Sequence, residues 1–96
     1  MKVYVSGKIT GTTDYKERFE TAENILRAGF GYDVINPAKV CAGLPEGMTH
    51  DEYMAVCLCL VNMCDAIYMM EGWRESNGAS IEYGYALAKG LRIIEV

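Results

Sequence analysis

Short strand-like runs alternate with helix-like segments along the whole chain, and this alternation is the feature that most constrains the fold. The runs rich in β-branched, aromatic and other apolar residues predict strands over 2–6, 32–35, 65–70 and 91–96. Apolar residues at helical spacing predict helices from about 14 to 29, 49 to 63 and 77 to 89. The resulting β-α-β-α-β-α-β order predicts an α/β, three-layer fold with a parallel sheet of about four strands and right-handed crossovers.

Local signals mark several ends of these segments. Asp14 with Glu17, and Thr49 with Glu52, have the spacing of a capping box at a helix start. Gly90 is a plausible C-cap between the last helix and the last strand. The segment from 38 to 48, which carries Gly and Pro at the frequency of a loop, is predicted to be a loop after a strand that ends at Asn36-Pro37.

The length and the net charge of the chain limit the functions that it can have. A chain of 96 residues forms one domain over 1–96 and leaves no room for a second core. The net charge is −4 with no basic run, so duplex nucleic acid and anionic membranes are poor partners, whereas a small anion in a local site is compatible. Residues 1–5 lack the pattern of a signal peptide, which predicts a cytoplasmic protein. The uncharged run 53–64 is too short to span a bilayer.

The cysteines do not predict a metal site. Cys41, Cys57, Cys59 and Cys64 form no Cys-x-x-Cys pair, and the single histidine, His50, lies in a helix-start signal. Most of the cysteines fall in the apolar helix, where free thiols behave as small hydrophobic groups in a reducing compartment. From residue 53 onward this helix is apolar on nearly all sides, so the helix 50–63 is predicted to lie in a homodimer interface.

Parallel sheets bind ligands beyond the carboxyl ends of their strands, which predicts a site made of three loops: 7–13, Asn36 onward, and 71–78. The first loop, SGKITGTT from residue 6, lacks both the dinucleotide fingerprint and the Walker pattern. Its Gly7, Lys8 and Ile9 either cradle a phosphate together with the neighbouring hydroxyls or form a plain turn.

The run GWRESNGASIE over 72–82 contains the strongest candidate for chemistry. Ser76, Asn77 and Gly78 suit a helix N-cap whose free backbone N–H groups favour anions. Glu82 follows one turn later, and its side chain leans back toward that loop. Apolar and small neighbours favour a functional carboxylate there, although an acid in a first turn also complements the helix dipole.

Three further residues have two interpretations each. Tyr4 is either a core aromatic or a phenol that hydrogen-bonds a carboxylate or sugar oxygen in the site. Trp73 either stacks on a nucleobase or shields its own loop. Asp65 opens the third strand, at the sheet end opposite the site, and is expected to have a structural role in capping or pairing.

Taken together, YVSGKITG from residue 4, CDAIYM from residue 64 and the Gly-Trp-x-x-Ser-x-Gly-Ala-x-x-Glu segment resemble the nucleoside 2-deoxyribosyltransferase-like superfamily. More narrowly, nearly the whole chain resembles its short branch, the family called domain of unknown function 4406. The resemblance implies a flavodoxin-like sheet, no cofactor, and a nucleoside or nucleotide as the small-molecule partner. Members cleave or exchange the N-glycosidic bond of deoxynucleosides or their 5′-monophosphates.

The resemblance implies roles for particular residues. Glu82 falls at the position of the nucleophile and Tyr4 at that of the tyrosine that orients it. Ser76 stands where the 5′-monophosphate hydrolases have a phosphate-binding serine and the transferases an aspartate. Two positions depart from the pattern: Cys57 replaces an aspartate that handles the proton of the leaving base, and Thr10 replaces the hydrolases' arginine, with Lys8 nearby.

The hypothesis is therefore an N-glycosidase-type hydrolase that releases the base from 2′-deoxynucleoside 5′-monophosphates. Glu82 captures C1′ as an ester, as in retaining glycosidases, with Tyr4 orienting it. Gly7, Lys8, Ile9, Trp73, Ser76 and Gly78 are the expected substrate-binding residues. The alternatives are a non-catalytic nucleotide-binding or sensing module that lacks the acid, and a deoxyribosyltransferase.

Overall fold

Four parallel strands form a single sheet in the order β2-β1-β3-β4. The computed structural model describes residues 1–95. The strands are β1 (Lys2–Ser6), β2 (Asp33–Ile35), β3 (Ala66–Met69) and β4 (Arg92–Glu95). In the register of the sheet, Val3 of β1 lies between Val34 and Ala66. The predicted α/β class and four-stranded parallel sheet are confirmed; Val96, assigned above to the last strand, lies outside the described residues.

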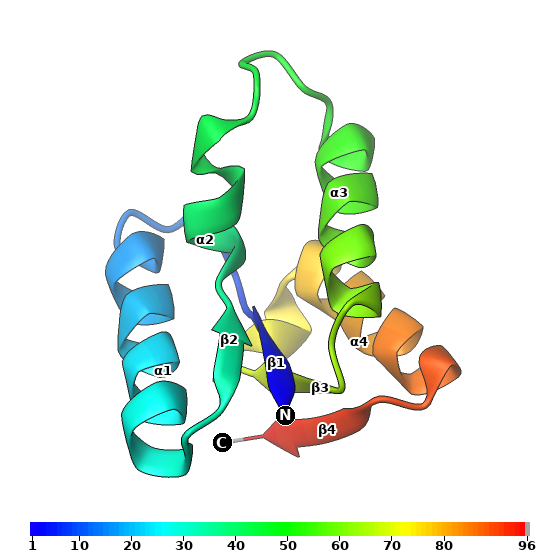
Figure 1. The fold of residues 1–96 in the computed structure, drawn as a ribbon. Coiled ribbons are helices and arrows are strands. Elements are labelled where there is room, and N and C mark those ends of the chain that lie inside the picture. Colours follow the sequence, from blue (N-terminus) through cyan, green and yellow to red (C-terminus); the bar gives the residue numbers. More distant parts are fainter. Residues whose placement is uncertain (96) are drawn as a thin grey trace.

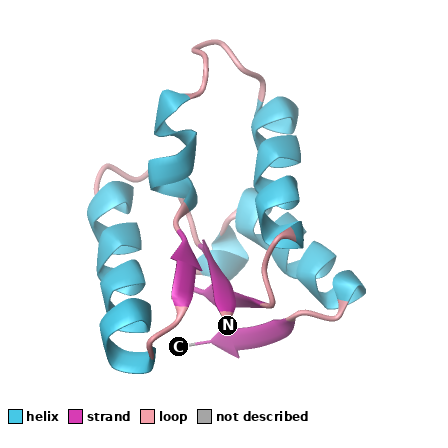
Figure 2. Cartoon of the chain, viewed as in Figure 1, coloured by secondary structure: helices cyan, strands magenta, loops and turns pink. Residues whose placement is uncertain are grey.

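Helices cover both faces of this sheet and make three layers (Figures 1 and 2). Helix α1 (Tyr15–Phe30) packs on one face, and α3 (His50–Asn62) and α4 (Asn77–Lys89) pack on the other. The strand alternation divides the two cores, since Val3 and Val5 join the α1 side and Tyr4 joins the α3 and α4 side. The architecture is flavodoxin-like, as expected, and helix α4 matches the helix predicted over 77–89.

The two capping-box predictions have opposite outcomes. Thr49 accepts a hydrogen bond from the backbone N–H of Glu52, and Glu52 accepts one from that of Thr49, so the box that opens α3 is confirmed. The prediction for Asp14 is wrong, because its backbone (φ −108°, ψ 13°) is not extended and its side chain makes no cap hydrogen bond. Asp14 instead pairs with Arg18 at 3.6 Å.

The segment predicted as a loop from 38 to 48 begins with helical structure. Helix α2 (Pro37–Val40) and the 3-10 helix η1 (Cys41–Gly43) precede the remaining loop. The carboxamide oxygen of Asn36 accepts from the N–H of Ala38 at 3.0 Å, and Pro37 begins the helix with a pre-set φ. The Asn-Pro pair that ends β2 therefore also starts a helix, and the loop prediction is wrong for 38–43.

Asp65 lies at the amino-terminal edge of the sheet, away from the carboxyl ends of the strands. Its carboxylate accepts a hydrogen bond from the backbone N–H of Lys2 at 3.0 Å, and its own N–H donates to the carbonyl of Lys2. These bonds join the starts of β1 and β3. The predicted structural role of Asp65 is confirmed.

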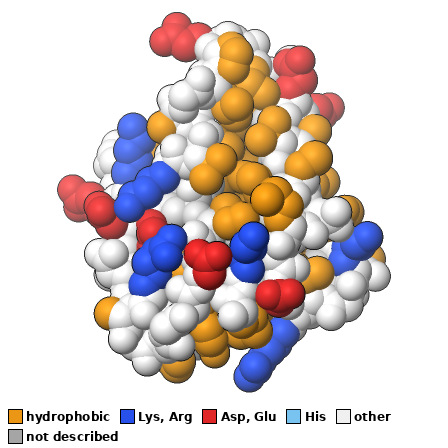
Figure 3. All heavy atoms as spheres, in the orientation of Figure 1, with side chains coloured by type: hydrophobic (Ala, Val, Ile, Leu, Met, Phe, Trp, Pro, Cys, Tyr) orange, Lys and Arg blue, Asp and Glu red, His pale blue; other side chains and the backbone are white. Residues whose placement is uncertain are grey.

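Hydrophobic side chains gather over α2 and α3 on the face of the molecule seen in Figure 3. Helix α3 buries Met54, Cys57 and Val61 and leaves Ala55 and Cys59 exposed. No helix within residues 1–95 is long and apolar enough to cross a membrane.

Candidate active site

A pocket of about 730 Å³ opens at the carboxyl ends of the strands. This volume is in the range of small-molecule sites. The loops after β1 and β2 and the η2 (Trp73–Glu75) to α4 connection contribute walls, as the strand order requires, and α3 supplies a further wall. Of the predicted site residues, Tyr4, Gly7, Lys8, Ile9, Ser76, Gly78 and Glu82 all line it.

Glu82 is the buried acid of this pocket, with 6% of its surface exposed. One carboxylate oxygen accepts a hydrogen bond from the phenol of Tyr4 at 2.6 Å, and the other accepts one from the hydroxyl of Ser6 at 2.6 Å. Tyr4 and Ser6 are two residues apart on β1, so strand alternation points both side chains to the α4 side of the sheet. The predicted contact between Tyr4 and Glu82 is present, and the carboxylate is held in one orientation.

Burial raises the pKa of Glu82, because desolvation disfavours the carboxylate. The hydrogen bonds from Ser6 and Tyr4 and the neighbouring Cys57 thiol act in the opposite direction and favour the charged form. Burial, and after it the negative charge of Glu82, raises the pKa of Tyr4 well above the usual value of a phenol. Tyr4 therefore remains a hydrogen-bond donor at neutral pH.

Ser6 was not among the residues predicted from the sequence. It is 1% exposed, and the polar group of such a buried serine needs a partner. The sequence does contain a signal for Ser6, because a residue two positions after Tyr4 on a strand points to the same face of the sheet as Tyr4. Gly7 follows it, and a Cβ at Gly7 would lie 2.9 Å from the sulfur of Met70, so the backbone there packs too closely for a side chain.

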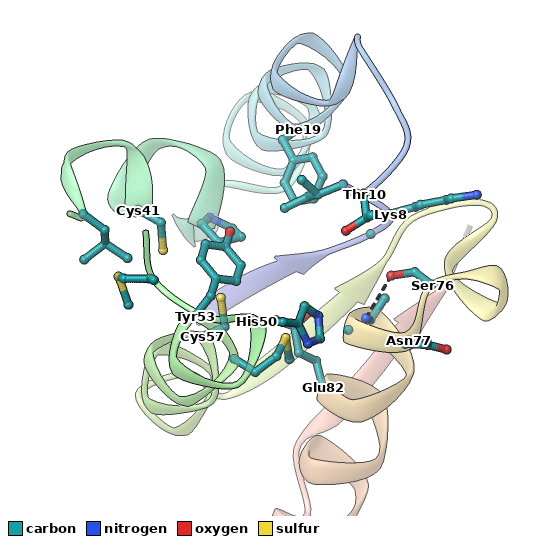
Figure 4. A pocket seen from close by; sticks show the side chains of 18 of the residues that line it. Lys8, Thr10, Phe19, Cys41, His50, Tyr53, Cys57, Ser76, Asn77 and Glu82 are labelled. Carbon is teal, nitrogen blue, oxygen red and sulfur yellow. Dashed lines mark hydrogen bonds between the residues drawn. The ribbon is translucent and has the colours of Figure 1, made fainter. Parts of the chain in front are cut away.

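The amino terminus of α4 forms one wall of the pocket, as Figure 4 shows. The Ser76 hydroxyl oxygen accepts from the N–H of Ala79 at 3.1 Å and leaves its own proton available to donate. His50, at the start of α3, also lines the pocket, and its Nε2 is 3.8 Å from the point where a Cβ on Gly78 would lie. In the sequence, His50 is recognisable only as part of a helix-start signal, because nothing local shows that α3 and α4 meet.

Trp73 does not line the pocket. Its ring is 7% exposed and stacks on Tyr83 of α4 at a centroid distance of 4.5 Å, with the Arg74 guanidinium 4.6 Å from the ring centroid. The loop after β3 turns this indole into the core, where its N–H finds no hydrogen-bond partner among residues 1–95. The structure therefore does not support base stacking by Trp73 and favours the alternative, an aromatic that packs within its own loop and helix.

The thiol of Cys57 and the phenol of Tyr53 line the α3 side of the pocket. Cys57 is 1% exposed, and burial raises its pKa to about 12. Tyr53, one turn earlier on α3, also has its pKa raised, first by burial and then by the Cys57 and Cys41 sulfurs. Both groups stay protonated and neutral at physiological pH, so this wall presents soft, uncharged atoms to a ligand.

A buried polar network supports the α2 wall. Glu23 of α1 accepts from Asn36 at 3.1 Å and from Arg27 at 2.8 Å, and Lys39 approaches it at 3.2 Å. Burial acts to raise the pKa of Glu23, but these three partners outweigh it and lower the pKa. Asn36 thus fastens the end of β2 to α1 while its oxygen caps α2. Within residues 1–95, no group of three or more His, Cys, Asp or Glu residues is arranged to hold a metal ion.

The fold is a flavodoxin-like α/β sandwich with a pocket at the carboxyl ends of its parallel strands. The structure is similar to the 2-deoxyribosyltransferase of Bacillus psychrosaccharolyticus, with a TM-score of 0.77 over 99% of this chain and 71% of that chain. The identity is 16%, so the likeness is one of fold. The model of the family described as domain of unknown function (DUF4406) matches residues 1–95, and the chain belongs to that family. No curated protein matches the sequence significantly.

Proposed function

We propose that this protein is a cytoplasmic N-glycosidase-type hydrolase that releases the base from 2′-deoxynucleoside 5′-monophosphates. The observation that carries the proposal is the Glu82 carboxylate, buried in the pocket and held through both oxygens by Tyr4 and Ser6. An enzyme that needs a nucleophile in a defined orientation requires this kind of support. The four free cysteines are compatible with a reducing compartment.

In the proposed reaction, Glu82 attacks C1′ as the bond to the base breaks. Positive charge develops at C1′ in the transition state, and a nearby carboxylate stabilises it and then captures it as an ester. Water hydrolyses that ester in a second step. A 2′-deoxy sugar lacks the electron-withdrawing hydroxyl and ionises more readily, which suits a site with one nucleophile.

Groups at the end of the pocket away from Glu82 are the reason to expect a nucleotide and not a nucleoside. Ser76 lies six residues before Glu82, roughly 9 Å along the helix axis, with a hydroxyl proton free to donate. The backbone N–H groups at the start of α4 favour an anion. Lys8, from the loop after β1, lines the same pocket and adds a positive charge. Together these groups suit a 5′-phosphate.

Cys57 favours a second candidate function, a nucleotide-binding or sensing module. Its thiol lies next to Glu82, and a thiol with a pKa of about 12 is a poor proton donor at neutral pH. A protein can retain such a pocket for binding without chemistry. Deoxyribosyl transfer between bases is a third candidate function. It is supported by the similarity of the fold to that of a 2-deoxyribosyltransferase.

One experiment separates the three functions. The purified protein is incubated with a panel of deoxynucleoside 5′-monophosphates and the matching nucleosides, and free base is measured by chromatography. Free base from the monophosphates supports the hydrolase, whereas nucleotide binding by calorimetry without base release supports the module. Addition of a second free base, followed by the appearance of a new nucleotide, identifies a transferase.

Removal of either hydroxyl that holds Glu82 is expected to slow base release by roughly 10- to 100-fold, since a hydrogen bond to a charged group is worth about 1.5–3 kcal/mol. The variants are Tyr4→Phe and Ser6→Ala. Both hydrogen bonds lower the pKa of Glu82, so in each variant that pKa rises. The nucleophile must be ionised, and the acid limb of the rate profile therefore moves to higher pH. The measurement is kcat/KM against pH.

Matched controls for these two variants lie elsewhere on the same elements. Tyr68→Phe removes a phenol from β3 on the α1 side of the sheet, and Ser80→Ala removes an exposed hydroxyl from α4. Both are expected to keep the wild-type rate and pH profile. A Ser6→Ala variant with an unchanged acid limb would contradict the role given to Ser6.

We also propose that the protein is a homodimer through α3. The exposed Ala55 and Cys59 are four residues apart and therefore share one face of that helix. Met63, just after the helix, is 59% exposed, and Val40 of α2 is 52% exposed. Figure 3 shows the hydrophobic surface that these elements form, and an apolar face of this kind is typical of a protein interface.

Substitutions that place a charge on this face of α3 test the proposed dimer. Ala55→Arg and Cys59→Arg are expected to convert a dimer into a species of 10.7 kDa in sedimentation, because a buried guanidinium without a partner opposes association. Thr21→Arg, on the exposed side of α1, is the control and should leave the dimer intact. Wild-type protein that sediments as a 10.7 kDa monomer at all concentrations would contradict the interface.

A further inference from the structure

His50, the single histidine of the chain, lies on the face of α3 that lines the pocket. The lining residues of this helix recur at the spacing i, i+3, i+4 and i+7 and are His50, Tyr53, Met54 and Cys57. From α4, Gly78 and Glu82 line the pocket four residues apart and therefore also share one face. One face of α3 and one face of α4 thus border the pocket.

The two helix faces approach each other closely at Gly78. The sulfur of Met54 and the Nε2 of His50 are 3.2 Å and 3.8 Å from the point where a Cβ on Gly78 would lie. A side chain there would crowd the thioether, so the glycine lets α3 approach α4. Glu82 is one turn farther along α4, roughly 6 Å along the helix axis. The imidazole of His50 therefore lies about one helical turn from the level of the buried carboxylate.

This separation suits the two groups that a displacement at C1′ requires. In the proposed reaction Glu82 attacks one face of C1′ and the bond to the base breaks on the opposite face, so a proton donor must lie beyond C1′. In retaining glycosidases the acid and the nucleophile are about 5–5.5 Å apart. The side chain of Glu82 leans toward the amino terminus of α4 and hence toward Gly78. His50 is therefore placed along the pocket as such a donor must be.

Figure 4 indicates how a nucleotide would fit around His50. Lys8 and Ser76 lie on one side of the pocket, and Tyr53 and Cys41 lie on the other, with His50 between them. The groups that suit a phosphate thus leave the opposite wall for the base. An imidazole between the two walls is close to the bond that joins base and sugar.

The other groups that could give up a proton are less well placed. Cys57 lies next to Glu82, but burial raises its pKa to about 12. Asp51 follows His50 in sequence and does not line the pocket, and Glu75 lines it from η2, beside Ser76. An imidazole ordinarily gains and loses a proton near neutral pH, as a general acid must. The titratable groups that line the pocket with His50 are Tyr4 of β1, Lys8 after it, Cys41 of η1, Tyr53 and Cys57 of α3, Glu75 of η2 and Glu82 of α4.

We propose that His50 is the general acid of this site and that its imidazolium donates the Nε2 proton to the base as the bond between C1′ and the base breaks. The bonding electron pair goes to the base nitrogen, the base leaves as a neutral molecule, and Glu82 forms the ester with C1′. The neutral imidazole then accepts a proton from the water that displaces Glu82, so both side chains return to their starting forms. The inference rests on the proposed function and names the proton donor that Cys57 does not provide.

The test compares wild type with His50→Gln on 2′-deoxyguanosine 5′-monophosphate and on its N7-methyl derivative, at a pH where the methylated base is cationic. Uncatalysed base loss is subtracted. A cationic base leaves as a neutral molecule without a proton from the enzyme. We therefore expect kcat/KM of the variant to fall about 10²- to 10⁴-fold on the neutral substrate and to stay close to the wild-type value on the N7-methyl substrate. Asp51→Asn, at the same end of α3 and away from the pocket, is the control and should keep both rates.

Two further measurements distinguish a proton donor from a residue that supports the fold. His50 is exposed, so free imidazole added to His50→Gly is expected to restore part of the rate on the neutral substrate. In wild type, kcat/KM on the neutral substrate should fall over the pH range in which the NMR signals of this single imidazole titrate. That basic limb should be absent with the N7-methyl substrate.

The outcomes separate this inference from the proposed function. Equal losses on both substrates in His50→Gln would overturn the inference, because the residue would then bind the phosphate or support the fold. A wild-type rate in His50→Gln, or a loss confined to the neutral substrate in Glu75→Gln, would also overturn it. Should His50→Gln fail to fold, a wild-type rate that does not follow the imidazole titration overturns the inference. Base release by wild type from the N7-methyl substrate alone refutes the acid and leaves the hydrolase, whereas no release from either substrate overturns the proposed function itself.

Discussion

Replacement of Glu82 by glutamine is expected to reduce base release by roughly 10³- to 10⁶-fold, the range seen when a catalytic nucleophile is removed. Glutamine has nearly the same shape and can still bond to Tyr4 and Ser6, so the fold and the pocket are retained. The amide is neutral, and it neither stabilises positive charge at C1′ nor forms the ester. The measurement is single-turnover release of base from a deoxynucleoside 5′-monophosphate.

Two controls make the Glu82→Gln result specific. Glu17→Gln makes the same chemical change at an exposed position on α1 and should keep the wild-type rate. Nucleotide binding by calorimetry should persist in Glu82→Gln, which shows that the pocket is intact. Base release from Glu82→Gln at the wild-type rate would remove this residue from the mechanism.

The same variant tests the electrostatics of the site through stability. Burial raises the pKa of Glu82 in the folded state, so the native protein binds a proton more tightly than the unfolded chain. This contribution to stability is fully present below the unfolded pKa and is lost as pH rises through the folded pKa. Glutamine does not titrate. Chemical denaturation should therefore show the variant gaining stability relative to the wild type as the pH rises above the unfolded carboxyl pKa and through the raised folded pKa.

Much of the fold was predictable from local pattern. The alternation of strand and helix signals identified four strands and three of the helices, and parallel topology then implied which loops meet. Helix α2 was missed because four residues are too few to show a periodicity, and the Gly and Pro content around it is that of a loop. Helix α2 is started by a single cap, that of Asn36. From the sequence alone, the loop-forming residues Pro45 and Gly47 hide this one signal.

The site was predictable where a residue's position followed from its own element. Glu82 is one turn into α4 and Tyr4 faces the same side of the sheet, so their contact follows from strand alternation and helix direction. Trp73 and His50 show the limit of that reasoning. Trp73 is turned into the core by Tyr83 of α4, and His50 reaches the pocket because α3 crosses near Gly78. Both depend on packing between elements distant in sequence.

Asn36→Asp is expected to destabilise the protein by about 3 kcal/mol at pH 7, because a carboxylate replaces the amide that donates to buried Glu23. The shape and the cap of α2 are kept, since the remaining side-chain oxygen still accepts from Ala38. The change therefore isolates the loss of one donor and the repulsion between two carboxylates. Arg27 and Lys39, which also contact Glu23, limit the effect.

Proton linkage gives this last prediction an internal check. Two carboxylates that share a buried site hold a proton more tightly, so the folded pKa of the pair is raised in Asn36→Asp. The native state then binds the proton that relieves the repulsion, and the destabilisation should shrink as pH falls from 7 toward 4. Asn24→Asp, an identical change at an exposed position on α1, should cost less than about 0.5 kcal/mol. The measurement is urea denaturation of both variants. An equal loss of stability in Asn24→Asp and Asn36→Asp, or a loss in Asn36→Asp that does not depend on pH, would mean that the Glu23 network does not hold the α2 wall of the pocket.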